Sequence, residues 1–138
     1  VYPGKVHFLK HMEAIVRTEA SPSLSAFIHQ RMRWVSKSTQ YTDKRITLIL
    51  AGSYLFNLSI LMLLVSGIFN ATALITAILL LCLKGITEGI LIHRVVSFLG
   101  IRNIFKWFIP SQLVHIIYVL FIGIAGNLFS YRWKGRKG

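Results

Sequence analysis

ITLILAGSYLFNLSILMLLVSGIFNATALITAILLLCL, residues 46–83, is an uncharged run of 38 residues. A helix that crosses the hydrocarbon core of a bilayer needs about 20 apolar residues, so this run is too long for one span and fits two. The turn-forming sequence GIFN at 67–70 divides it. We therefore predict a transmembrane hairpin over residues 46–92, with a first span at 46–66 and a second at 71–92.

A second uncharged run, with histidine counted as neutral, covers residues 107–131. The chain has 138 residues, of which 54% are hydrophobic, and a mean hydropathy of +0.62. This is too apolar for an ordinary soluble domain, so we predict a mainly α-helical membrane protein with a third apolar helix at 107–131. Pro110 and the sequence GIAGN at 123–127 leave two paths open, because this segment either crosses the bilayer or is re-entrant. A crossing would place the basic tail at 132–138 outside, against the positive-inside rule.

The formal net charge of +12 has two common explanations. A basic surface can bind nucleic acid, but no nucleic-acid-binding motif accompanies these cations. The lysines and arginines instead flank the apolar runs, as they do on the cytoplasmic side of a membrane. We therefore predict the lipid bilayer as a partner and no nucleic acid. The sequence HRVVSFLGIRNIFK at 93–106 is expected to be a basic surface segment on the cytoplasmic side.

Residues 21–37 have the periodicity of an amphipathic helix. Ser21 is a candidate N-cap, and Pro22 fits the first helical position. This helix is too polar to span a bilayer and is suited to the membrane surface. We therefore predict an interface helix and its linker over residues 21–45. The expected apolar face consists of Leu24, Phe27, Ile28, Met32 and Val35.

Residues 1–20 contain two β-like pieces, KVHFL at 5–9 and EAIVRTEA at 13–20. β-Branched and aromatic residues favour strands, but two short strands do not form a stable sheet alone. Because the chain also begins with Val1, we expect this segment to be the trailing edge of a soluble α/β domain. The chain would then be a fragment of a longer protein whose catalytic domain lies upstream.

The predicted interface helix carries the sequence Gln30-Arg31-Met32-Arg33-Trp34. It resembles the QxxRW motif of membrane-bound family 2 glycosyltransferases, which include the cellulose, chitin and hyaluronan synthases and many bacterial envelope enzymes. In that family the motif lies on an amphipathic interface helix, after the catalytic domain and before transmembrane helices. The order of segments here is the same, and the ending WKGRK at 133–137 is similar to the tail of many bacterial members.

The resemblance implies an inverting transfer of sugar from a nucleotide-sugar donor to an envelope polysaccharide or glycolipid acceptor. It places the enzyme in a bacterial inner membrane, with the interface helix cytoplasmic. It also implies that Gln30, Arg33 and Trp34 border the acceptor and diphosphate pocket, with Arg31 nearby. These residue types suit the task, because a guanidinium binds two phosphate oxygens at once and an indole offers a flat platform for a sugar ring.

Two interpretations of this helix remain open. In the alternative, the chain is a non-catalytic membrane anchor or interaction module with a basic interfacial helix. Its cations would then contact lipid phosphates, and Trp34 would belong to the aromatic belt of the interface.

Parts of the expected catalytic machinery are missing from the sequence. Members of the family use carboxylates to hold Mg²⁺ or Mn²⁺ against the diphosphate and an Asp as general base. None of the carboxylates here forms a DxD motif, so we expect no metal site and no catalytic residue in this chain and place both upstream. The acidic residues are Glu13, Glu19, Asp43 and Glu88.

Lys84 and Glu88 form an i,i+4 pair within the second predicted span. Ionisable residues inside a membrane suggest a function, here the polar lining of an acceptor path. The other explanation is a self-neutralising pair whose Lys84 snorkels to the surface. His93 and His115 have no partners at metal-ligand spacing and are expected to make ordinary polar contacts.

The single cysteine, Cys82, has no second cysteine with which to form an internal disulfide, and one thiol does not make a metal site. It lies within an apolar run, so we expect it to be a small core residue.

Overall fold

The computed structural model of the chain describes residues 9, 11–16, 18–38, 41–101, 105–133 and 136–137. Within these residues the protein is mainly helical, as predicted. Two short strands at the C-terminal end pair antiparallel, with Arg132 opposite Lys137. The elements are η1 (Met12–Ala14), α1 (Leu24–Ser36), α2 (Lys44–Ser66), α3 (Ala71–Leu99), α4 (Phe105–Leu128), β1 (Arg132–Trp133) and β2 (Arg136–Lys137).

Helices α2 and α3 form the predicted hairpin, with its turn at the predicted place. The side chain of Asn70 caps α3 by accepting hydrogen bonds from the backbone N–H groups of Thr72 (2.9 Å) and Ala73 (3.3 Å). α2 begins two residues earlier than expected, because the Asp43 carboxylate accepts from the Arg45 N–H at 2.9 Å and caps it.

Among the described residues, three helices are long and apolar enough to cross a membrane: Lys44–Ser66, Ala71–Leu99 and Lys106–Leu128. Only 11% of the apolar windows of the first two is buried within the protein, so most of their large side chains are left for another apolar environment. This is the expected surface of helices that face lipid.

The basic segment predicted at 93–106 is in part helical. α3 runs on to Leu99, and Gly100, with a φ of 65°, ends it in the left-handed region that favours glycine. A helix of 29 residues is about 43 Å long, compared with about 30 Å for the hydrocarbon core. Residues 93–99 therefore continue the second span as helix; residues 102–104 lie outside the described part.

α4 is continuous from Phe105 to Leu128 although it contains Pro110. Proline lacks the N–H that would bond to the carbonyl of Lys106, but it stands only in the second turn, where the loss affects a single bond. An unbroken helix of this length favours a crossing over a re-entrant path. The GIAGN sequence lies inside the helix and serves packing, as described below.

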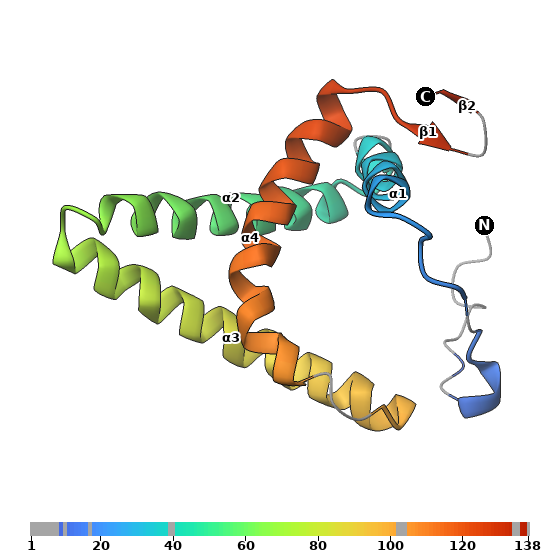
Figure 1. The fold of residues 1–138 in the computed structure, drawn as a ribbon, viewed down its shortest axis with the longest axis horizontal. Helices are drawn as coiled ribbons and strands as arrows, with labels where there is room; N and C mark the ends of the chain where they lie inside the picture. Colours follow the sequence, from blue (N-terminus) through green and yellow to red (C-terminus); the bar gives the residue numbers. More distant parts are fainter. Residues whose placement is uncertain are drawn as a thin grey trace.

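Figure 1 shows how the helices are arranged. α2 and α3 form a hairpin that opens away from their turn, α4 lies across them, and α1 is seen nearly end-on beside α4, at a large angle to α2. α4 packs against each of the other three helices. One apolar cluster joins α1 to α4 through Met32, Ile122 and Ala125. The other joins α2 to α4 through Ile60, Ile116 and Leu120.

The N-cap of α1 is Ser23 rather than Ser21, since the Ser23 hydroxyl accepts the backbone N–H of Ala26 at 3.1 Å. The predicted apolar face of this helix is largely confirmed: Met32 is 5% exposed, and Ile28 and Val35 pack beside it. The assignment of Leu24 to this face is wrong, because Leu24 is 73% exposed in the first turn of the helix.

Two other expectations, on Cys82 and on the N-terminal β-like pieces, are not confirmed. Cys82 is exposed and not a core residue, because its face of α3 turns away from the other helices. The predicted β-like pieces are not seen where residues 11–16 and 18–20 are described, and a 3₁₀ turn occupies Met12–Ala14 instead. Most of the first piece, residues 5–8, lies outside the described residues.

Candidate functional site at the interface helix

A close contact with α4 fixes the position of α1. A Cβ atom added at Gly126 would lie 2.8 Å from Cβ of Val35 and 3.1 Å from the backbone oxygen of Met32. Only a glycine lets the two helices approach this closely, and small residues serve the same purpose in many helix pairs of membrane proteins. The motif residues are therefore carried on a helix whose distance from α4 is set by packing.

Arg31 and Trp34 of the motif are in contact. The guanidinium carbon of Arg31 lies 4.5 Å from the ring centroid of Trp34 and 4.9 Å from that of Phe27. Residues three and four apart share a helix face, so the two rings hold the cation between them. The Nε atom of Arg31 is buried, with no hydrogen-bond partner among the described residues. The stack orients this cation before any ligand arrives.

The other two motif residues are placed separately. The side-chain oxygen of Gln30 accepts a hydrogen bond from the Ser21 hydroxyl at 3.2 Å, which ties the segment before α1 to the helix. Arg33 is half-buried, and its backbone carbonyl accepts from the Ser36 hydroxyl at 3.0 Å. The resemblance to the motif implied that both residues border one pocket with Trp34, and it did not indicate these contacts.

A groove of about 820 Å³ opens between α1, α2 and α4. Trp34, which is 46% exposed, stands at its α1 end. Gln30, Arg31 and Arg33 do not line the groove, although Arg31 contacts this indole. The lining residues are Trp34, Val35, Ser38, Tyr41, Thr47, Leu50, Ala51, Ser53, Tyr54, Leu55, His115, Tyr118, Val119, Ile122, Gly123 and Asn127.

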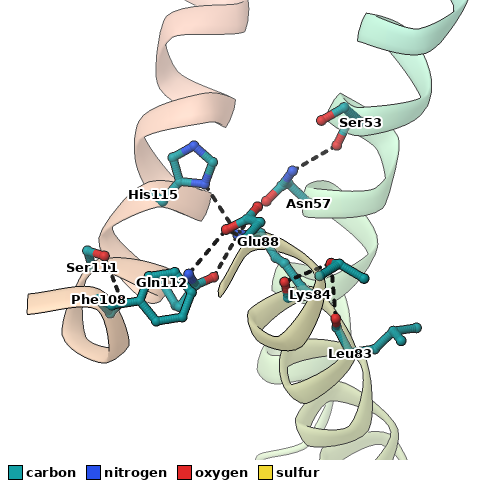
Figure 2. Close-up of polar contacts among 10 residues, drawn as sticks. Ser53, Asn57, Leu83, Lys84, Glu88, Phe108, Ser111, Gln112 and His115 are labelled. Carbon is teal, nitrogen blue, oxygen red and sulfur yellow. Dashed lines mark hydrogen bonds and ion pairs between the residues drawn. The ribbon is translucent and has the colours of Figure 1, made fainter. Parts of the chain in front are cut away.

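A group of polar side chains, separate from the motif residues, lies where α3 meets α4 (Figure 2). The ammonium of Lys84 donates to Glu88 (2.9 Å) and to the side-chain oxygen of Gln112 (2.8 Å), and lies 3.3 Å from Nδ1 of His115. Gln112 in turn donates to Glu88 at 3.1 Å. We call these four residues the polar cluster.

The polar cluster satisfies its buried cation. An ammonium has three donors, and Lys84 meets three acceptors if Nδ1 of His115 accepts, which places the ring proton on Nε2. Lys84 is 4% exposed, so the alternative explanation, in which it snorkels to the surface, is wrong. The neighbouring helix supplies acceptors that a lone i,i+4 pair would lack.

Gln112 and Asn57 were not predicted from the sequence. Gln112 lies three residues before His115 in an otherwise apolar run, which puts both on one face of α4, and this spacing was the available signal. Asn57 on α2 is 2% exposed; it donates to the Ser53 carbonyl at 2.8 Å, while its Oδ1 has no partner among the described residues. Figure 2 shows its hydrogen bond to Ser53 on α2.

Ring contacts connect the two groups. Tyr118 lies between them, with its centroid 5.8 Å from that of Phe27 and 6.1 Å from that of His115. Because Phe27 also contacts Arg31, a continuous series of side chains leads from the motif to Lys84. The motif helix and the polar cluster are thus two ends of one structure built on α4.

No group of three or more His, Cys, Asp or Glu side chains is placed to hold a metal ion within the part of the chain that the structure describes. The Mg²⁺ or Mn²⁺ expected upstream stays a prediction about residues outside this chain.

The fold and the site together are consistent with a multi-pass membrane protein that carries a basic amphipathic helix over an apolar groove. No protein-family model, no curated protein and no solved structure matches the chain.

Proposed function

We propose that this chain is the membrane-anchoring, acceptor-side part of an inverting glycosyltransferase. The enzyme transfers a sugar from a nucleotide-sugar donor to an envelope polysaccharide or glycolipid, in a bacterial inner membrane, with α1 on the cytoplasmic side. A catalytic domain upstream supplies the nucleotide site, the Mg²⁺ or Mn²⁺ ligands and the base. The observation that carries the proposal is the position of Trp34 in QRMRW, at the α1 end of a groove and stacked on a cation.

Sugar transfer requires cations near the leaving diphosphate, and a flat ring suits the binding of a sugar. The acceptor oxygen forms a bond to the anomeric carbon, the bond from that carbon to the diphosphate breaks, and the diphosphate leaves with the electron pair. The proton of the acceptor goes to the upstream base. Guanidinium groups near the leaving diphosphate stabilise its growing charge, and they act more strongly when already oriented. The rings that hold Arg31 supply such orientation.

The second candidate function is a non-catalytic anchor, and the exposed Leu24 in the first turn of α1 favours it. An exposed leucine on a basic helix suits insertion into the bilayer interface. Both candidate functions place α1 at the membrane surface. They are distinguished by whether loss of the motif lowers sugar transfer.

The test uses the purified full-length protein that contains this chain, in lipid nanodiscs with Mg²⁺ or Mn²⁺ and a panel of UDP- and GDP-sugars. The readout is release of UDP or GDP. A charge-assisted hydrogen bond contributes about 1.5–3 kcal/mol. Arg33→Ala should therefore lower kcat/KM by roughly ten- to over a hundredfold. Trp34→Ala, which removes the sugar platform, should also lower it. Arg33→Lys should recover little, because a point charge does not reproduce the two-pronged contact.

Lys37 provides the matched control, because it is an exposed cation at the end of the same helix. Lys37→Ala should lower kcat/KM by less than about threefold if it meets only lipid phosphates. Equal small losses for Arg33→Ala and Lys37→Ala at equal membrane insertion would support the anchor and refute the enzyme.

A further inference from the structure

The groove is long enough to reach from one membrane surface to about the middle of the bilayer. On α2 its lining runs from Thr47 to Leu55, which is about 12 Å along the helix axis. Because α2 begins at Lys44, the groove ends about 17 Å from the start of a helix of membrane-spanning length. In a hydrocarbon core about 30 Å thick, such a groove leads from one surface to about the middle of the bilayer.

The walls of the groove suit an aliphatic chain. Leu50 and Leu55 on α2 line it and are 45% and 61% exposed, while Val119 and Ile122 face them from α4. A glycan here would set hydroxyl groups against these side chains, at a cost of roughly 1–3 kcal/mol for each hydroxyl left without a hydrogen bond. A hydrocarbon chain has no such groups, so the groove favours a lipid over a polysaccharide.

The shallow end of the groove is basic. Lys44 and Arg45 begin α2 less than one turn before Thr47. The acidic residue of this stretch, Asp43, is engaged in capping α2. The Thr47 hydroxyl lines the groove and is buried, without a hydrogen-bond partner in the described part of the chain. Positive charge with a spare hydroxyl is suited to a phosphate group.

We propose that this groove holds a membrane lipid whose head group carries a phosphate, and that this lipid is the acceptor. The word acceptor rests on the function proposed above, whereas lipid binding stands on the groove itself. The head group lies by Thr47 and Trp34, and the chain lies between Leu50 and Val119. The acceptor oxygen is then held at the membrane surface, where the upstream domain presents the donor.

Photolabelling tests the groove without any enzymatic readout. The full-length protein is placed in phosphatidylcholine nanodiscs that contain either a phosphatidic acid or a phosphatidylcholine with a photoactivatable acyl chain. Labels should concentrate on the α2 and α4 peptides that contain Leu50 and Val119, with about fivefold more from phosphatidic acid. Ala51→Trp should reduce this labelling several-fold by filling the groove. The matched control is Leu79→Trp, on an exposed site of α3 that does not line the groove.

A second measurement follows the sugar. After reaction with a labelled nucleotide-sugar, the product should partition into organic solvent. Specific photolabelling without any sugar transfer would leave the lipid groove standing and remove the proposed function. Labels spread evenly over α3 and the groove, or a water-soluble glycan as product, would overturn the lipid acceptor and leave the glycosyltransferase intact.

Discussion

Two of the contacts that hold α4 are of opposite kinds. In its C-terminal half it meets α1 through Ile122 and Ala125 on Met32, with the helices brought together at Gly126. In its N-terminal half it meets α3 through the polar cluster, where Lys84 is bonded to side chains of both helices. The first contact is made by shape and the second by charge and hydrogen bonds.

The difference shows what holds helices together when lipid removes the hydrophobic drive to associate. Lipid tails are as apolar as leucine, so association in a bilayer depends on close packing and on polar bonds. A shape contact is sensitive to added volume. A charged contact is sensitive to the loss of one partner, because the other is left buried and unpaired. The predictions below use these two sensitivities to test the comparison.

The largest loss of stability is expected for Lys84→Met. It leaves the Glu88 carboxylate facing Gln112 without its cation, and breaking one side of a buried pair costs about 3–5 kcal/mol. Glu88 is about one-third exposed, so we expect a value near the lower limit. The measurement is the free energy of unfolding in mixed detergent micelles.

The double variant Lys84→Met with Glu88→Leu is its control. Replacing both charges by apolar groups of similar size should restore much of the loss. If the double variant is as unstable as Lys84→Met alone, the charge is not the reason for the loss, and the comparison between shape and charge fails at this end.

The long elements of this fold were predictable and the contacts between them were not. The run at 46–83 fixes the hairpin, because length and lack of charge are local properties of the sequence. The N-cap of α1 was misplaced by two residues, since Ser21 and Ser23 are both good caps and the choice depends on where Gln30 draws Ser21. Local preference could not decide between them.

The sequence predicted which residues form the candidate site but not how they contact one another. The motif indicated Gln30, Arg31, Arg33 and Trp34, but a pattern does not show that Arg31 is the cation stacked on the indole. That contact depends on rotamers. Likewise Lys84 and Glu88 were visible as a pair, whereas Gln112 joins them from another helix, 28 residues from Lys84. Such a meeting follows from how α4 crosses the hairpin and not from any local period.

A smaller loss is expected for Gly126→Ala. The new methyl group would stand 2.8 Å from Cβ of Val35 and 3.1 Å from the Met32 carbonyl oxygen, so the α1 backbone must move. Overpacking of this kind costs about 1–3 kcal/mol. The matched control is Gly85→Ala, where nothing lies within 4 Å of the added atom, and it reports the gain from helix propensity alone. Equal stabilities of the two variants in the same micelles would show that α1 and α4 are not closely packed.

The smallest effect is expected for Gly123→Ala, one turn before Gly126 on α4. Its added Cβ would come within 2.5 Å of Cε2 and 2.8 Å of Cδ2 of the Tyr54 ring, nominally a closer contact than that at Gly126. The obstacle here is a side-chain ring that lines the groove, whereas the obstacle at Gly126 includes backbone. We therefore expect a loss under about 1 kcal/mol, less than for Gly126→Ala although the nominal overlap is larger. Unfolding free energies of both variants, measured beside Gly85→Ala, decide the order. A greater loss at Gly123 than at Gly126 would mean that Tyr54 is fixed in place, and the groove would then be a rigid wall instead of an adaptable one.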